Sequence, residues 1–398
     1  MKSYKMKSYM TEIYPTPSQI ELIHKTFGCT RYIYNQFVYE NLQNLASDTP
    51  FVSAYDYSKR INNDPNRPLW LKEVSSKALK QALIYADRAF RRYFSKIDGK
   101  PKFKRKGSSE SFYLIGTIKV ERHRIFVPTL KWVRLKEFGY IPKNITSVTI
   151  SMKNGRYYIS CLCKDEKDEH IPLSNYTMGI DFGLKDQFMT EDRVIPSINK
   201  SLRVRKLEQR LRREQRKLSR KYEANMVDKI YYKTGAKKGQ LKSYKWLKPL
   251  DECKNIQKQK LKVARIYERL TRIRTEYNRK ALRSLVLERK PSAITIEDLA
   301  VLNMMKNRHL SKTISNAQWY QSRLYLENLC KKLGIELRLV SRFYPSSKLC
   351  SDCGFKYKDL KLNERTWACS NCGSKHDREV NAAINLGRCK EYTVLTAV

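Results

Sequence analysis

The segment Met178-Gly179-Ile180-Asp181-Phe182-Gly183 decides the fold expected for the second half of the chain. It has the composition of a short buried strand that places one carboxylate between apolar neighbours and ends in a glycine turn. Residues Gln187 to Thr190 form a second predicted strand, which we expect to pair back on the first. Further strands are predicted at Ala293–Leu299 and Ile335–Val340, with a helix at Gln318–Leu333 between them. This alternation of strands and helices predicts an α/β domain.

Two long helices are predicted between these strands. Apolar residues recur at heptad positions among many arginines in residues 202–220, and residues 263–277 repeat the same three-four alternation. We expect these two segments to form a helical hairpin. Their connection, roughly Lys221 to Asn255, is long and basic and contains Tyr231, Tyr232 and Trp246. It is predicted to be a loop, and a loop of that length inside a compact domain is usually functional or mobile.

The first hundred residues are predicted to be a strand followed by helices. Tyr14-Pro15-Thr16-Pro17-Ser18 closes a strand-like segment and opens a helix, with Thr16 or Ser18 as its cap. A later helix begins near Ser76, where Leu79, Ala82, Leu83, Ala86 and Phe90 lie on one face. Strands are then expected at Ser111–Leu114 and, as a hairpin across Asn154-Gly155, at Ser147–Met152 and Tyr157–Leu162.

The charge of the chain points to a polyanionic partner. Its 398 residues include 81 Lys and Arg against 39 Asp and Glu, a formal net charge of +42. Solubility requires a net charge of only about 2–8 in a small domain, so nucleic acid is the leading candidate. A membrane surface is not favoured, because no amphipathic helix beside a lysine run is found at either end, and no apolar run is long enough to span a bilayer. We expect a soluble cytoplasmic protein of two or three domains.

Basic and aromatic residues alternate in Pro101-Lys102-Phe103-Lys104-Arg105-Lys106-Gly107. The four cations, Lys102, Lys104, Arg105 and Lys106, are candidates for phosphate contacts. For Phe103, packing in a core is favoured over stacking on a base.

Four of the ten cysteines form a metal-binding pattern. Cys350, Cys353, Cys369 and Cys372 read Cys-x2-Cys-x15-Cys-x2-Cys, and each pair can present two thiolates to one tetrahedral zinc ion. Two disulfides are the alternative, but they fit a cytosolic chain poorly. Four cysteine ligands leave no open position, so a Zn²⁺ ion here is expected to be structural.

Acids lie at three separate element ends, at residues 181, 297–298 and 377–379. A single acid in such a place usually caps a helix or pairs with an arginine. Three of them in a chain of this charge favour a site that gathers carboxylates around Mg²⁺, where two ions about 3.5–4 Å apart can act on a phosphodiester.

These residues resemble the TnpB family, transposon-associated RNA-guided DNA endonucleases similar to the ancestors of type V CRISPR effectors. The resemblance spans nearly the whole chain. Its most specific part runs from Ser346-Ser347-Lys348-Leu349-Cys350-Ser351-Asp352-Cys353-Gly354 to Asn381-Ala382-Ala383. The other markers are Tyr14-Pro15-Thr16, residues 29–35 (Cys-Thr-Arg-Tyr-Ile-Tyr-Asn), residues 100–104, Gly179–Gly183 and Ile296–Leu299.

The resemblance implies a multidomain α/β plus α+β protein. A β-barrel wedge domain (1–15 and 100–175) would carry a helical recognition domain (16–99) as an insertion. A RuvC-like nuclease domain of the RNase H fold (176–343 and 377–398, with the helical hairpin at 200–290) would be interrupted by a zinc ribbon (344–376). The implied partners are a guide RNA from the transposon end, with one protein per guide RNA, and target double-stranded DNA beside a short recognised motif.

The resemblance also assigns residues. Asp181 and Glu297 match the first two RuvC acids, and Lys77 and Gln81 match positions that contact the adjacent DNA motif. The third acid is commonly the second Asp of an Asp-Arg-Asp-x-Asn-Ala-Ala run, where this chain has Glu379. The extra methylene matters because a misplacement of about 1 Å can cost about a hundredfold in rate. Asp377 would be the alternative ligand, or a helix cap; we favour Glu379 and an active enzyme.

Two other functions stay open on the sequence alone. One is a nuclease-impaired relative that binds DNA under RNA guidance and acts as a repressor. The other is a zinc-ribbon RNA-binding protein whose acids are structural. Asp181 and Glu297 separate these from a nuclease, because a pure binding module has no need of acids at strand ends.

Overall fold

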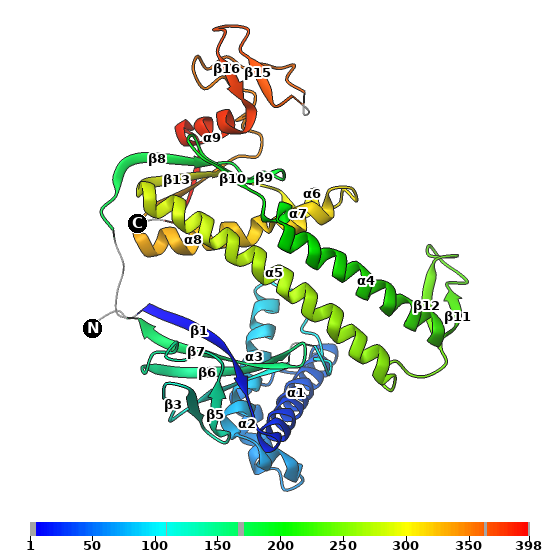
Figure 1. The fold of residues 1–398 in the computed structure, drawn as a ribbon. Helices are drawn as coiled ribbons and strands as arrows, with labels where there is room; N and C mark the ends of the chain where they lie inside the picture. Colours follow the sequence, from blue (N-terminus) through cyan, green and yellow to red (C-terminus); the bar gives the residue numbers. More distant parts are fainter. Residues whose placement is uncertain (1–4, 109, 166–170, 362–363, 397–398) are drawn as a thin grey trace. The chain divides into compact units, whose positions relative to one another are not determined.

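The computed structural model describes residues 5–108, 110–165, 171–361 and 364–396. The chain divides into two compact units, residues 1–167 and 168–398 (Figure 1). None of the described helices is long and apolar enough to cross a membrane.

The first unit is built on one antiparallel sheet in the spatial order β2-β6-β7-β1-β5-β4-β3. Its strands are β1 (Lys5–Tyr14), β2 (Glu110–Ile115), β3 (Lys119–Val120), β4 (Arg124–Val127), β5 (Lys131–Leu135), β6 (Ile145–Lys153) and β7 (Arg156–Asp165). The N-terminal strand β1 pairs with β7 and, at its end, with β5. The predicted β6–β7 hairpin is confirmed, and Asn154 and Gly155 take the positive φ values of 52° and 67° that its turn requires.

Helices α1 (Pro17–Ala46), α2 (Ala54–Asn63) and α3 (Ser76–Phe94) and the 3-10 helix η1 (Leu69–Glu73) complete this unit. Thr16 is the cap of α1, because its hydroxyl accepts from Gln19 N at 3.4 Å while Gln19 Oε1 accepts from Thr16 N at 2.9 Å. The predicted apolar face of α3 is also confirmed, since all five of its residues are buried.

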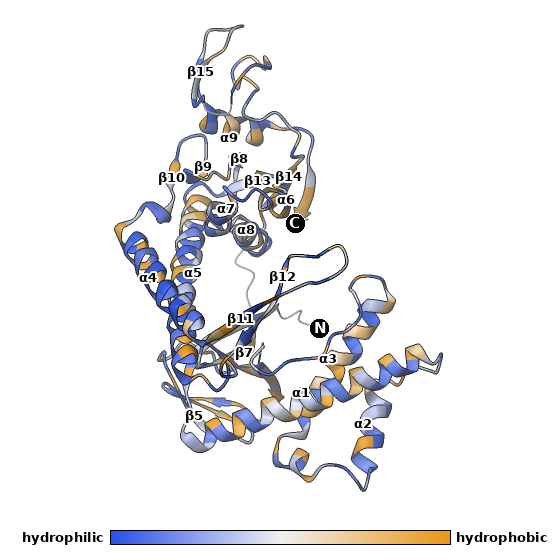
Figure 2. Cartoon of the chain, turned by 90° about the vertical axis from the view of Figure 1, so that its right-hand side faces the viewer, coloured by the Kyte–Doolittle hydropathy of each residue, from blue (hydrophilic) through white to orange (hydrophobic). Residues whose placement is uncertain are grey.

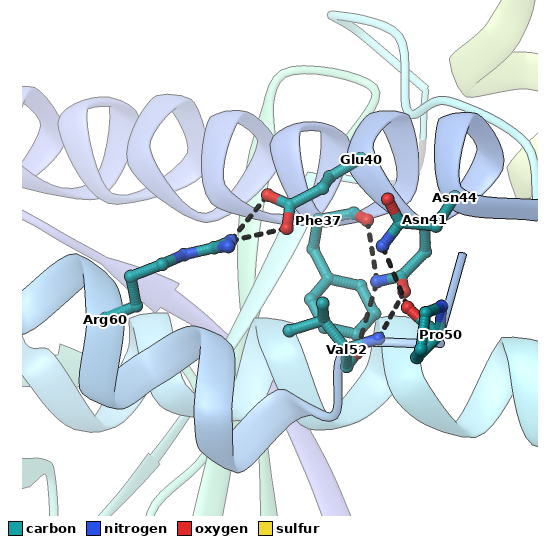
Figure 3. Close-up of polar contacts among 7 residues, drawn as sticks. All are labelled: Phe37, Glu40, Asn41, Asn44, Pro50, Val52 and Arg60. Atoms are coloured by element: carbon teal, nitrogen blue, oxygen red, sulfur yellow. Dashed lines mark hydrogen bonds and ion pairs between the residues drawn. The ribbon is translucent and has the colours of Figure 1, made fainter. Parts of the chain in front are cut away.

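A loop is tied to α1 by side-chain amides (Figure 3). Asn41 is fully buried; its Oδ1 accepts from Val52 N at 2.9 Å and its amide donates to Phe37 O at 3.2 Å. Nearby, Arg60 of α2 pairs with both carboxylate oxygens of Glu40. These contacts hold α2 against α1.

The second unit has a four-stranded sheet in the order β17-β14-β13-β8. Strand β8 (Ser174–Ile180), β13 (Pro291–Glu297) and β14 (Glu336–Val340) are parallel, and β17 (Thr393–Thr396) is antiparallel to β14. The remaining strands, all in two-stranded ladders, are β9 (Asp186–Met189), β10 (Val194–Pro196), β11 (Met226–Tyr231), β12 (Leu241–Trp246), β15 (Thr366–Ala368) and β16 (Lys375–Asp377).

Helices pack on both faces of this sheet. The helices of this unit are the 3-10 helix η2 (Ile198–Lys200), α4 (Leu202–Asn225), α5 (Lys254–Arg289), α6 (Val301–Met304), α7 (Ser311–Ala317), α8 (Trp319–Leu333) and α9 (Arg378–Arg388). Buried residues of α5, α7 and α8 share one core with β8, β13 and β14, whereas α9 lies on the other face (Figure 1). Parallel strands joined through helices fit the predicted α/β pattern.

Strand β9 pairs back on the first strand less than predicted. Among the described residues, β9 and the segment that continues β8 share only one bridge, in which Asp181 and Met189 exchange backbone hydrogen bonds of 2.9 and 3.0 Å. Beyond this bridge β9 forms its ladder with β10.

Helices α4 and α5 form the predicted helical hairpin, held together by Val204, Leu207, Leu211, Val263 and other buried residues. The prediction of a loop at Lys221–Asn255 was wrong. Helix α4 continues to residue 225, strands β11 and β12 pair as a hairpin, and α5 begins at residue 254. Lysines interleaved with the strand-forming aromatic and aliphatic residues obscured this pattern in the sequence.

Candidate active site and metal centre

Asp181 and Glu297 follow equivalent positions of two neighbouring parallel strands. In the ladder between β8 and β13, Ile180 is paired with Ile296, so the next residue on each strand is an acid. Both isoleucines belong to the core beneath the sheet. Because side chains alternate along a strand, the two acids are placed on the opposite face.

Helix α9 covers that opposite face at very short range. A Cβ atom on Gly179 would lie 1.9 Å from the Ala383 carbonyl oxygen and 2.5 Å from the Gly387 backbone nitrogen. Both atoms are backbone and cannot rotate away. Glycine at residue 179 is therefore required for the helix to lie this close to β8.

The direction of α9 brings its first turn to the end of β8. A Cβ atom on Gly387 would lie 3.2 Å from the Thr177 carbonyl oxygen, so the C-terminal turn lies over the body of the strand. The N-terminal turn, which carries Glu379, is consequently directed toward Asp181. The negative charge of Glu379 acts on Asp181 at that end of the strand.

The electrostatics of Asp181 reflect this convergence of acids. Its side chain keeps some exposure to solvent, but it is densely surrounded by protein. Desolvation, followed by the negative charges of Glu297 and Glu379, raises the pKa of Asp181 to about 7. Burial and the neighbouring Asp298 also raise the pKa of Glu297. Several carboxylates thus share a region in which arginines compensate their negative charges only in part.

Asp298 differs from its neighbour Glu297. Its carboxylate forms ion pairs with Arg323, at 3.3 Å, and with Arg342. Neither arginine is paired with Glu297 among the ion pairs of the described residues. Of the two consecutive acids, Glu297 is therefore the one available to a cation.

The two candidates for the third acid have different surroundings. Asp377 is the N-cap of α9, and its Oδ1 accepts from the backbone nitrogens of Glu379 and Val380 at 3.0 and 3.1 Å. Glu379 lies in the first turn and pairs with Arg365 at 2.9 Å. Asp377 thus has a capping role, while Glu379 faces both an arginine and the carboxylate of Asp181.

Two buried asparagines of α9 fix the helix to the segment before the cysteines. Asn381 Oδ1 accepts from Ser351 N at 2.9 Å, and its amide donates to Leu349 O at 2.7 Å. Asn385 donates to the same carbonyl at 2.6 Å and to Ser346 O at 2.8 Å. Sequence reasoning missed the positioning roles of Gly179 and these amides, although a glycine inside a strand signals a close backbone approach.

The four cysteines of the predicted zinc site lie together. The Sγ atoms of Cys350 and Cys372 are 3.7 Å apart, and those of Cys353 and Cys369 are 3.6 Å apart. Tetrahedral zinc with Zn–S bonds of about 2.3 Å has S···S edges of about 3.8 Å. A disulfide would need about 2.05 Å. These thiols therefore fit one zinc ion and not two disulfides.

Around the cysteines, Trp367 stacks on Tyr357 with ring centroids 5.6 Å apart and contacts His376. In the described part of the chain, the four cysteines are the only set of three or more His, Cys, Asp or Glu side chains whose ligand atoms all lie within 4.8 Å of one another. The carboxylates at residues 181, 297 and 379 are spaced more widely than that.

We expect the purified protein to contain about one zinc ion per chain. Cys369→Ser should lower this content to nearly zero, because three thiolates and a hydroxyl hold zinc far less tightly. Cys253→Ser is the matched control, since Cys253 lies outside the cluster. Elemental analysis measures the content. A zinc-free wild-type protein, or equal loss in both variants, would contradict the zinc site.

The residues predicted to bind nucleic acid lie in the first unit. Lys77 and Gln81 are one turn apart on α3, where Lys77 is exposed and Gln81 half-buried. Lys102, Arg105 and Lys106 are exposed in the segment between α3 and β2.

Lys104 and Phe103 have distinct surroundings in that segment. The Lys104 ammonium lies over the Tyr34 ring, 4.2 Å from its centroid, and the Lys104 backbone pairs with Asn35. Lys104 is nevertheless exposed, and its contact with phosphate stays a prediction. The preference for core packing of Phe103 was wrong, because half of its surface is exposed.

Comparisons with known proteins agree along the chain. Family models match residues 1–48 ("Helix-turn-helix domain"), 160–308 ("Probable transposase") and 319–386 ("Cas12f1-like, TNB domain"). The protein "Putative RNA-guided DNA endonuclease" of Streptomyces pristinaespiralis is 30% identical over 96% of this chain and 88% of its own length. The protein "Putative RNA-guided DNA endonuclease InsQ" of Escherichia coli is 24% identical over 96% of this chain and 92% of its length.

A solved structure is similar in fold. The "Cryo-EM structure of the Cas12f1-sgRNA-target DNA complex" matches with a TM-score of 0.56 at 12% identity, covering 98% of this chain and 100% of that chain. The chain thus has the fold of a compact type V nuclease.

Proposed function

The chain belongs to the TnpB family of transposon-associated RNA-guided DNA endonucleases, and from that membership we propose how it cuts. It binds a guide RNA derived from the transposon end, recognises a short motif beside the target and cleaves the DNA with Mg²⁺-dependent RuvC chemistry. The observation that carries the proposal is the convergence of Asp181, Glu297 and Glu379 at one end of the sheet, where desolvation together with the charges of Glu297 and Glu379 raises the pKa of Asp181 to about 7. In a chain with a net charge of +42, acids gathered in this way indicate a site for cations.

We assign the finer architecture in the same way. The second unit is read as a RuvC-like domain of the RNase H fold, from residues 176–343 and 377–398, with residues 344–376 as a zinc ribbon. In the first unit, the sheet of strands β1–β7, expected at residues 1–15 and 100–175, is read as the wedge β-barrel and residues 16–99 as its helical recognition insertion. The expected end at residue 175 is too late, because Ser174 and Asn175 belong to β8 of the second unit. The pairing of β1 with β5 and β7 supports joining the two wedge segments.

The donor set suits Mg²⁺. All three candidate ligands offer carboxylate oxygens, which this hard cation prefers. When bound, a pair of Mg²⁺ ions supplies charge stabilisation to both the attacking and the leaving oxygen of a phosphodiester. The protein's part is to hold these carboxylates at the end of the sheet, which β8, β13 and the closely packed α9 accomplish.

A repressor remains the alternative because of one contact. Arg365 pairs with Glu379 at 2.9 Å and competes with a cation for that carboxylate. If the pair persists in the DNA-bound state, the third ligand is lost and the protein binds without cutting. The longer Glu side chain, in place of the usual Asp, favours the same outcome.

The decisive experiment uses the protein purified with its co-expressed RNA. Incubation with matched double-stranded DNA and Mg²⁺ is expected to produce cleavage. EDTA should abolish this cleavage, and a mismatched DNA should not be cleaved. Guided binding without cleavage would establish the repressor instead. Recovery of no discrete RNA would contradict both. Light scattering of the same preparation tests whether one protein binds each guide RNA. We propose that the protein cleaves DNA in the prokaryotic cytoplasm, where its target DNA lies.

Cleavage is expected to fall as the pH drops through about 7. Below the raised pKa, about 7, Asp181 is a neutral acid and a poor ligand for Mg²⁺. Because protons and Mg²⁺ compete for the same oxygens, tenfold more Mg²⁺ should lower the midpoint by up to about one pH unit. Cleavage rates across this range at two Mg²⁺ concentrations measure the shift. If the pH midpoint of cleavage does not change with the Mg²⁺ concentration, the assignment of Asp181 as a ligand is contradicted.

A further inference from the structure

The β11–β12 hairpin at the junction of α4 and α5 has no role in the function proposed so far. Helix α4 has 24 residues and is therefore about 36 Å long, so the hairpin stands at the end of the helix remote from the four-stranded sheet (Figure 1). Within the described residues, β11 and β12 pair only with each other. An isolated two-stranded hairpin is marginally stable in water, so its presence calls for additional contacts.

Contacts with α4 hold the base of the hairpin in place. Asn225, the last residue of α4, donates from its amide to Lys248 O at 2.8 Å and accepts from Lys248 N at 3.1 Å. Its backbone carbonyl accepts from Leu247 N at 2.8 Å. The hairpin is thus joined to the helix by three hydrogen bonds and has a defined direction.

An aromatic row continues from the helix onto the hairpin. The ring of Tyr222, on α4, lies 5.7 Å from that of Trp246, and the ring of Trp246 lies 5.3 Å from that of Tyr244. Residues two apart on a strand share one face, so Tyr244 and Trp246 point the same way. Tyr244 is 41% exposed, although an aromatic ring serving only to stabilise the hairpin would be covered.

The row is surrounded by cations. Residues 226–248 contain seven lysines and one aspartate. Lys229 is directly opposite Tyr244 and therefore shares its face. Lys242 lies at the register shift of the hairpin, and its ammonium is 5.9 Å from the centroid of the Tyr232 ring. Figure 2 shows that the neighbouring helix α4 is hydrophilic over most of its length. An exposed ring that continues a row of two half-buried rings, with lysines beside it, matches the two needs of an unpaired nucleic acid strand, stacking for its bases and cations for its phosphates.

We propose that Tyr222, Trp246 and Tyr244, with the hairpin lysines, form a stacking platform for unpaired nucleotides of the guide RNA. The inference rests on the proposed function. The occupant is the RNA and not the cleaved DNA strand, because the cut strand must reach Asp181 and the platform is about one helix length away. A resident RNA can occupy such a remote surface permanently.

The test compares guide-RNA binding by full-length variants, using the RNA recovered with the wild-type protein and transcribed anew. Tyr244→Ala should weaken binding by about tenfold and leave the slope of log K against log salt unchanged. Lys229→Ala, at the exposed lysine opposite Tyr244, should weaken it less and lower the magnitude of the slope by about 0.7. Tyr55→Ala, at a 72% exposed tyrosine on α2, is the matched control and should bind like wild type. Thermal melting verifies that each variant folds.

Other outcomes would overturn the platform. One is unchanged RNA affinity of Tyr244→Ala. A second is an equal loss toward a fully paired RNA duplex, which offers no bases for stacking. A third is unchanged RNA affinity with weaker binding of target DNA by the loaded complex, which would assign the platform to DNA. Failure of the proposed function is distinct, because then the wild-type protein itself recovers no RNA or cuts no matched DNA.

Discussion

Asp181→Asn is expected to lower guided DNA cleavage on the order of a thousandfold while leaving guided DNA binding close to wild type. The substitution keeps the shape of the side chain and removes the negative charge that a cation needs. Binding persists because the guide RNA and the basic surfaces supply it. Cleavage rates and DNA affinities of the RNA-loaded complex measure the two effects separately.

This variant should not be less stable than the wild type. The pKa of Asp181 is about 7 in the folded chain, against 3.8 as its ordinary value. Between these values the folded chain holds a proton that the unfolded chain releases, so metal-free wild-type protein loses stability as the pH rises through that window. The Asp181→Asn variant has no proton to release at this position and does not lose stability in this way. At pH 8 in EDTA, its melting temperature should be equal to or higher than that of the wild type.

Asp251→Asn is the matched control, because Asp251 is exposed in the turn before α5. It should cleave like wild type. If the Asp181→Asn variant cleaves DNA at the wild-type rate, Asp181 does not belong to the active site. Loss of DNA binding together with cleavage would instead mean that Asp181 has a structural role.

Gly179→Ala is expected to reduce cleavage by about a hundredfold or more and to destabilise the second unit by about 1–3 kcal/mol. The new Cβ would overlap the Ala383 carbonyl oxygen at 1.9 Å, so α9 must move away from β8. Glu379 would move with it, and the carboxylates would lose their mutual geometry. Cleavage assays and chemical denaturation measure both effects.

Gly28→Ala provides the contrast. Gly28 lies inside α1, and a Cβ there would meet nothing within 4 Å. Alanine should stabilise that helix by about 0.5–1 kcal/mol and leave cleavage unchanged. If Gly179→Ala retains both activity and stability, the close contact of α9 with β8 does not position the active site.

Local patterns predicted most of the elements and the cluster of four cysteines that could hold zinc. The cysteine spacing placed four thiols within reach of one ion, because each Cys-x2-Cys turn is set by its own few residues. The faces of α3, α4 and α5 followed from their apolar periodicity for the same reason. The β11–β12 hairpin escaped notice because lysines alternate with its apolar residues, and their aliphatic stems can occupy strand positions equally well.

By itself, the sequence determined the net charge, the strand and helix periodicities, the four cysteines that could hold zinc, and the candidate acids. Only the tertiary structure decided which acids meet. In the structure, Asp298 forms ion pairs with two arginines, Asp377 caps α9, and Glu379 is directed toward Asp181. For Glu379 and Asp181, the physical reason is how closely the backbones of α9 and β8 approach, which the absence of a side chain at Gly179 permits. Asp298 meets Arg323 and Arg342 because the fold brings together segments that are far apart in the sequence.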